Sequence, residues 1–140
     1  VQFAEFEKFI HSEISAGRTL QAEKLENYWL DSNKRYYGEA LTVDKELASE
    51  WSRIPHFYTP FYVYKYATGY SAATAFAASI LKGEEGAVEK YLGFLHAGGS
   101  DYSLNILKNA GVDLNTPQPV TVTLQKFAEK VAELKNLLGK

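Results

Sequence analysis

An all-α fold is predicted by this sequence from three observations. Apolar residues recur at intervals of three and four along most of the chain, which is the period of an amphipathic helix. Glycines and polar turns separate the periodic segments. No segment reads as a strand. We therefore expect a multi-helix, bundle-like architecture.

The N-terminal part is expected to contain two amphipathic helices and a short third one. The first helix ends at Gly17. Its apolar face consists of Phe3, Phe6, Ile10 and Ile14. Thr19 is expected to cap a second helix that ends near Gly38. Asp44 is expected to cap a short helix that runs to about Trp51.

A central helix is predicted from Phe61 to about Leu81. Thr59 and Pro60 have the residue types of an N-cap and a first helical position. The segment that follows is apolar nearly all round, with Lys65 as its only charge. A helix of that kind is usually enclosed by other helices, so we expect it at the centre of the fold.

Three further helices are predicted in the C-terminal part. One covers roughly residues 85–95 and is followed by the loop HAGGS. Ser100 is expected to cap a short helix that ends at Asn109. The last helix is expected over about 121–138.

The composition is that of a globular protein and argues against two classes of partner. Hydrophobic residues make up 46% and charged residues 23% of the chain. A net charge of −2 without a long basic run gives no electrostatic footprint for nucleic acid. No uncharged apolar run reaches the roughly 18 residues of a membrane span, and no signal peptide is recognisable. We therefore expect a cytoplasmic protein with neither nucleic acid nor membrane as a partner.

The sequence begins in an unusual way. Methionine is absent even from position 1, and the first residues, VQFAEFEKF, already follow a helical pattern. We therefore expect translation to start elsewhere, so that this chain is a piece of a longer protein.

Residues 53–70, RIPHFYTPFYVYKYATGY, carry a histidine and five tyrosines. A buried tyrosine whose hydroxyl has no partner loses about 1–3 kcal/mol that phenylalanine would not lose. On a helix Tyr62, Tyr66 and Tyr70 would share one face. This pattern favours a face that lines a polar or wet cavity. The alternative is ordinary packing, with each hydroxyl bonded to a main-chain carbonyl of a neighbouring helix.

His56 is a candidate for stabilising an anion, because it is expected just outside the mouth of the central helix. A neutral imidazole or a phenol can donate a hydrogen bond to an oxyanion that forms during acyl transfer. The alternative is a purely structural histidine between Pro55 and Phe57.

No metal site is expected within this chain. There is no HExxH motif, and His11, His56 and His96 lack the spacing that brings two ligands to one helical face. Cysteine is absent, which excludes thiolate ligands.

Several segments resemble the oligoendopeptidase F family of zinc metallopeptidases over almost the whole chain. They read FAEFEKFIH at 3–11, YYGEALTVD at 36–44, EWSRIPHFYTPFYVYKYATGYSAA at 50–73, KYLGFLHAGGSDY at 90–102 and LKNAGVDL at 107–114. The third segment is the most specific of these. The resemblance implies that residues 1–140 are the C-terminal portion of the catalytic domain of a larger, two-lobed helical peptidase.

The resemblance also implies a division of labour within the intact enzyme. Zinc would be the cofactor, held by an HExxH helix and a later glutamate that both lie upstream of this chain. The substrates would be short peptides in a central channel, and the partner of this chain would be the missing N-terminal portion. This chain alone would then be inactive.

The family's HFY and FYVYxYATG motif implies a set of site residues. His56, Tyr62 and Tyr66 would polarise the scissile carbonyl. Four further positions are expected to contribute to substrate binding: Tyr58, Tyr64, Gly69 and Tyr70.

Two other functions remain open at this point. One is a non-enzymatic helical module that binds a small ligand or a partner helix through its tyrosine-rich face. The other is a purely structural bundle, in which tyrosine-to-phenylalanine changes are neutral.

Overall fold

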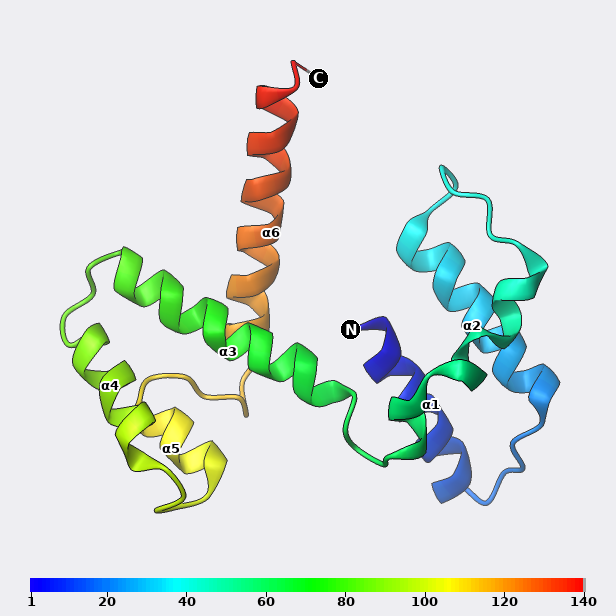
Figure 1. The fold of residues 1–140 in the computed structure, drawn as a ribbon, viewed down its shortest axis with the longest axis horizontal. Helices are drawn as coiled ribbons and strands as arrows, with labels where there is room; N and C mark the ends of the chain where they lie inside the picture. Colours follow the sequence, from blue (N-terminus) through cyan, green and yellow to red (C-terminus); the bar gives the residue numbers. More distant parts are fainter. Residues whose placement is uncertain (140) are drawn as a thin grey trace. The chain divides into compact units, whose positions relative to one another are not determined.

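The computed structural model describes residues 1–139, and all of the regular secondary structure in that range is helical (Figure 1). The all-α prediction is therefore confirmed. The chain divides into two compact units, one formed by Val1–Ala67 and the other beginning at Thr68. The residues that meet at the site described below all belong to the first unit.

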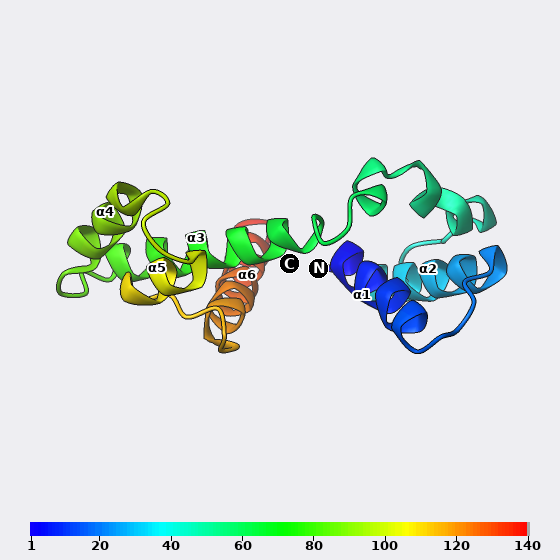
Figure 2. The same ribbon diagram turned by 90° about the horizontal axis from the view of Figure 1, so that it is seen from below.

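The first unit packs two α-helices and two 3-10 helices around an aromatic core. Its elements are α1 (Gln2–Ser15), α2 (Ala22–Tyr37), η1 (Lys45–Arg53) and η2 (Pro55–Tyr58). Helices α1 and α2 lie side by side (Figures 1 and 2). The fully buried Phe6 and Trp29 meet edge to face, with ring centroids 5.0 Å apart. These two rings and Leu25 form the buried cluster at the centre of the unit.

The helix boundaries in this unit differ from two of the expected caps. Helix α2 begins at Ala22 with Gln21 at the N-cap position, so Thr19 does not cap it. Asp44 does precede the next element, but its side chain makes no capping hydrogen bond and the element is a 3-10 helix. Neither helix therefore starts at a side-chain capping hydrogen bond.

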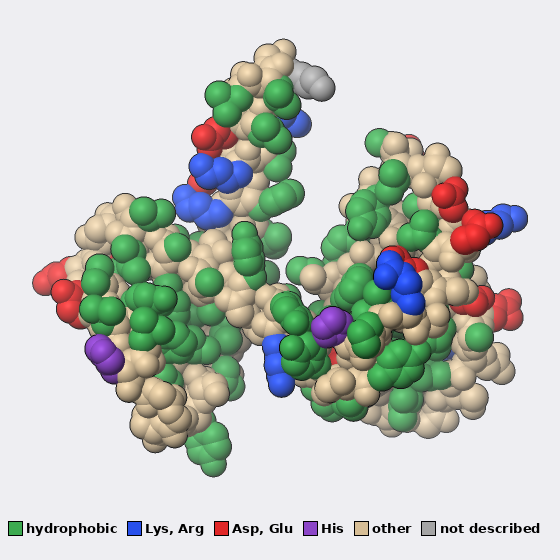
Figure 3. Space-filling view, in the orientation of Figure 1, with side chains coloured by type: hydrophobic (Ala, Val, Ile, Leu, Met, Phe, Trp, Pro, Cys, Tyr) green, Lys and Arg blue, Asp and Glu red, His purple; other side chains and the backbone are tan. Residues whose placement is uncertain are grey.

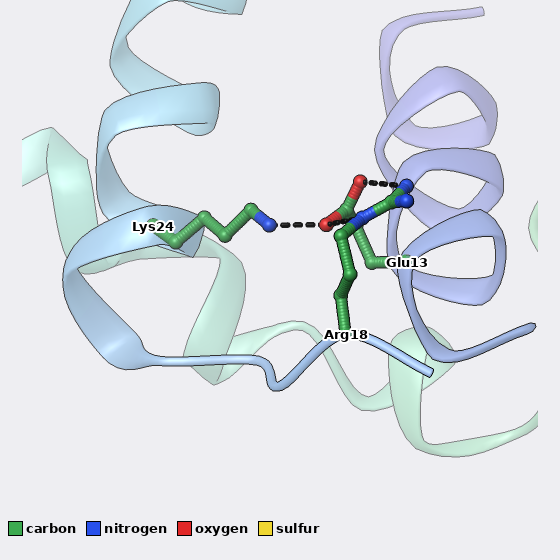
Figure 4. Close-up of polar contacts among 3 residues, drawn as sticks. All are labelled: Glu13, Arg18 and Lys24. Atoms are coloured by element: carbon green, nitrogen blue, oxygen red, sulfur yellow. Dashed lines mark hydrogen bonds and ion pairs between the residues drawn. The ribbon is translucent and has the colours of Figure 1, made fainter. Parts of the chain in front are cut away.

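A carboxylate near the end of α1 ties this helix to the start of α2 (Figure 4). Glu13 accepts two hydrogen bonds from the Arg18 guanidinium, at 2.8 and 2.7 Å, and a further one from the Lys24 ammonium. The hydrogen bonds from Arg18 and then Lys24 lower the pKa of Glu13 from 4.5 to about 2. Charge-assisted bonds of this kind favour the ionised carboxylate.

We expect the Glu13 cluster to make the folded state sensitive to acid. Because the folded-state pKa is the lower one, the stabilisation is complete above about pH 4.5 and is lost as the pH falls towards 2. Glu13→Gln should therefore lower the melting temperature at pH 7, and the difference from the parent protein should vanish near pH 2. Thermal unfolding followed by circular dichroism across this range measures the effect. Glu39→Gln, at an exposed loop position, is the matched control, and an equal loss in that variant would contradict the role of Glu13.

The central helix starts later than its sequence suggests. Helix α3 covers Tyr64–Leu81, and residues 59–63 form a turn instead of the first helical residues. Phe61 has a φ of 59°, the left-handed region that bulky side chains rarely adopt. Such a conformation is unfavourable by about 1–3 kcal/mol and persists only where the surroundings impose it. The expected cap and first helical turn at 59–61 are therefore wrong, and Tyr62 lies outside the helix.

The second unit contains the rest of α3 together with α4 (Ala87–Ala97), α5 (Ser103–Asn109) and α6 (Gln118–Leu137). Its core residues are mostly small: Ala72, Ala75, Phe76, Ala110 and Val112. Small side chains on α3 allow close packing on one face, whereas Tyr66 and Tyr70 on the same helix are 61% and 70% exposed. Within the described residues, α3 is thus covered on one face and is not enclosed all round as expected.

The remaining helices agree with the predicted segments, apart from their ends. Helix α5 has Tyr102 rather than Ser100 at its N-cap position. Helix α6 begins three residues before the expected position, with Pro119 in its first turn. Figure 3 shows apolar side chains along α6. Those most exposed there are Val120, Leu124, Phe127, Leu134 and Leu137.

Candidate functional site

Three aromatic side chains from the tyrosine-rich segment 53–70 meet in the first unit. The His56 ring stacks on the Tyr62 ring, with centroids 5.4 Å apart and planes 20° from parallel. The Tyr66 ring meets His56 edge-on at 5.8 Å and Tyr62 at 5.6 Å. His56 is half-buried, while Tyr62 and Tyr66 are exposed. We refer to these three residues as the His–Tyr–Tyr trio.

The two phenols of the trio are joined at their hydroxyl groups. The Tyr62 and Tyr66 oxygens lie 3.2 Å apart, within hydrogen-bond distance. The hydrogen bond with Tyr62 raises the pKa of the Tyr66 hydroxyl above its ordinary value of 10.0. Since one hydroxyl hydrogen is used within the pair, the other can be donated to a third group.

The core of the first unit determines where His56 lies. Its neighbour Phe57 packs edge to face against Phe6 at 5.1 Å and against Trp29 at 5.9 Å. Element η2 is therefore anchored through Phe57, which leaves the His56 ring on the side of the tyrosines. Tyr66 is held in the first turn of α3.

The turn before α3 brings Tyr62 back to His56. The Phe61 N–H donates a hydrogen bond to the Glu7 carboxylate at 2.8 Å, and Glu7 is only 5% exposed. The Phe61 ring stacks on His11, with centroids 4.4 Å apart. Neither Glu7 nor His11 was predicted from the sequence to contact this segment, because no local signal connects α1 with a turn some fifty residues later.

A pocket of about 290 Å³ opens beside the trio. His56 and Tyr66 form its polar part. Its other lining residues are Val1, Phe3, Ala4, Val63 and Ala67. Its volume is near the lower end of the roughly 300–1,000 Å³ typical of ligand sites, and it is large enough for one apolar side chain.

The other four expected site residues are not part of the ring contacts that define the trio. The Tyr58 hydroxyl donates a hydrogen bond to the Ser52 main-chain carbonyl at 2.8 Å. This is the bonding expected of a tyrosine used for packing rather than of one that lines a cavity. Tyr64 lies in the first turn of α3 and is 43% exposed. Gly69 and Tyr70 belong to the second unit. A Cβ atom at Gly69 would meet no atom within 4 Å, so no close contact in the described chain requires glycine there.

The residues present do not fit a metal ion. Among residues 1–139 there is no group of three or more histidine, cysteine, aspartate or glutamate side chains that would hold one. In the same range no helix is long and apolar enough to cross a membrane.

Comparisons with known proteins agree with the resemblance seen in the sequence. Residues 1–126 match the family model of peptidase family M3. The chain is 49% identical over 138 residues to oligopeptidase PepF of Bacillus subtilis and 42% identical over 139 residues to group B oligopeptidase PepB of Streptococcus agalactiae. Each alignment covers 99% of this chain but only 21% and 23% of those relatives. The chain therefore spans about a fifth of their length.

A solved structure is similar over the same extent. The crystal structure of oligoendopeptidase-F from Enterococcus faecium superposes with a TM-score of 0.93 and 44% sequence identity. The superposition covers 99% of this chain and 26% of that one. A putative peptidase from Chlamydophila abortus gives a TM-score of 0.87 at 43% identity.

Proposed function

The chain belongs to peptidase family M3, and on that basis we propose that it supplies oxyanion-stabilising and substrate-binding residues to an oligoendopeptidase that cleaves short peptides. The trio carries this proposal. It combines an imidazole and two joined phenols at an exposed position beside a pocket.

Tyr62 is the principal donor in this proposal. Either hydroxyl of the pair can be the donor, and we propose that Tyr66 donates to Tyr62. The Tyr62 oxygen then accepts from Tyr66, and the Tyr62 hydrogen is available to the carbonyl oxygen of a peptide. A hydroxyl that accepts one hydrogen bond becomes a better donor in the next.

His56 has two roles in the proposal. Its ring holds the plane of the Tyr62 ring by stacking, and its N–H group donates to the same developing negative charge. Preorganised donors of this kind act without reorganisation at the moment of reaction, which is why they lower the barrier.

The pocket beside the trio would bind an apolar side chain of the peptide next to the bond that is cleaved. Val63 and Ala67 contribute to its apolar lining, and Tyr66 contributes to its polar part. Tyr58, Tyr64, Gly69 and Tyr70 stay proposed substrate contacts, and Tyr58 is the weakest of them because its hydroxyl is already bonded.

Zinc is proposed as the metal of the intact enzyme, bound by residues outside this chain. The N-terminal portion that carries them is the proposed partner, with residues 1–140 as the C-terminal portion of the catalytic domain. The cytoplasmic location stays a prediction. The residues of this chain would stabilise developing negative charge and hold the peptide in place.

The proposal is tested by comparing two purified proteins, the 140-residue chain and the full-length protein that contains it. We expect zinc and cleavage of a quenched fluorescent peptide in the full-length protein only, because the chain holds no group of metal ligands among its described residues. Atomic absorption and fluorescence measure the two properties. A full-length protein that binds zinc but cleaves no peptide would contradict the proposed activity.

A further inference from the structure

We propose that Glu7 is a positioning residue, which holds the turn at 59–63 and through it keeps Tyr62 against His56. The catalytic consequence rests on the function proposed above, whereas the positioning itself does not. Glu7 lies on α1, far in sequence from the trio.

The position of Tyr62 depends on Phe61. His56 lies in η2 and Tyr66 in the first turn of α3, so both belong to helical elements. Tyr62 belongs to neither, and it reaches His56 only because the chain reverses just before it. The reversal uses the left-handed backbone of Phe61, with its φ of 59°.

The left-handed backbone conformation of Phe61 is unfavourable for phenylalanine. Within residues 1–139 Phe61 is the one residue other than glycine with a positive φ. Side chains with a Cβ avoid this region because the Cβ approaches the backbone too closely. An interaction from outside the turn must therefore hold it.

Helix α1 contacts Phe61 at two points. The carboxylate of Glu7 accepts the Phe61 N–H at 2.8 Å, and the ring of His11, one helical turn further along, stacks on the Phe61 ring at 4.4 Å. A carboxylate is a strong acceptor for a backbone N–H, and a buried one does not exchange its partner readily for water.

Glu7 is also buried. A hydrocarbon side chain at this position would pack without the free-energy cost of removing a charge from water. Glu7 is 5% exposed and follows Phe6, which is fully buried. A carboxylate at such a position is unfavourable unless it is hydrogen-bonded. Its bond to the turn accounts for an acidic residue there.

The experiment uses the full-length protein with the variants Glu7→Ala and Glu7→Gln. Histidine-selective isotope labelling reports on His56, whose signal is displaced by the ring current of the stacked Tyr62. We expect Glu7→Ala to move the His56 signal towards its position in Tyr62→Ala. Glu7→Gln keeps a neutral acceptor oxygen and should move the signal in the same direction by less, so it provides the test if Glu7→Ala does not fold.

Kinetics supply the second readout. Misplacement of a reacting group by about 1 Å can lower the rate by about 100-fold, so we expect Glu7→Ala to reduce kcat by about 10-fold to 100-fold with little change in KM. Because Glu7 acts through Tyr62, adding Glu7→Ala to Tyr62→Phe should cause little further loss. The matched control is Glu5→Ala. It removes another carboxylate from α1, one that pairs with Arg35 on α2.

The outcomes separate this inference from the proposed function. An unmoved His56 signal in Glu7→Ala and Glu7→Gln, or rate losses that add fully to those of Tyr62→Phe, would overturn the positioning role. If the signal moves in both variants while Tyr62→Phe keeps full activity, the positioning role is supported and the proposed function fails. A signal that moves equally in Glu5→Ala also counts against Glu7.

Discussion

Tyr62→Phe in the full-length protein is expected to lower kcat for a short peptide by about 100-fold to 1,000-fold, the usual effect of removing one oxyanion donor. The substitution removes a single oxygen and leaves the ring that stacks on His56. The rings of the trio should therefore keep their arrangement while the proposed donor is lost. Because the lost bond strengthens only as negative charge develops, KM should change little.

Steady-state kinetics with a quenched fluorescent peptide measure this effect. Tyr102→Phe is the matched control, since Tyr102 is 82% exposed on the second unit and lies outside the proposed site. A loss below threefold in Tyr62→Phe would exclude the donor role and would favour a purely structural use of the tyrosines. Tyr66→Phe is informative beside it, because it removes the other member of the hydroxyl pair.

His56→Phe is expected to have an effect of similar size, a fall in kcat of about 100-fold or more. Phenylalanine keeps a flat ring that can stack on Tyr62 and meet Tyr66 edge-on, as His56 does. It cannot donate a hydrogen bond. The loss would therefore be assigned to the missing N–H group rather than to a collapsed site.

The same peptide assay tests His56→Phe, with thermal unfolding as a check that the fold is kept. His96→Phe is the matched control, because His96 is exposed in the last turn of α4. A variant at position 56 that retains at least a third of the parent kcat would assign His56 a packing role only. A large loss in the position 96 variant would point to a general effect of replacing histidine.

The proximity of the three residues of the trio was predictable from the sequence because they are near one another in the chain. His56, Tyr62 and Tyr66 lie within eleven consecutive positions, and their unusual polarity for a core segment is visible without a structure. The details were not predictable. Tyr62 was expected on the same helix face as Tyr66, yet it meets Tyr66 from a turn that precedes the helix.

The sequence by itself determined the helical class and the approximate extent of most helices, because hydrophobic periodicity is a property of neighbouring residues. It also identified the aromatic segment and its likeness to a peptidase family. Only the tertiary structure decided how α3 begins. The left-handed backbone of Phe61 is unfavourable locally, and it is held by Glu7 from a position 54 residues earlier in the chain. No pattern of local propensities contains that contact, which forms only when α1 packs against the turn.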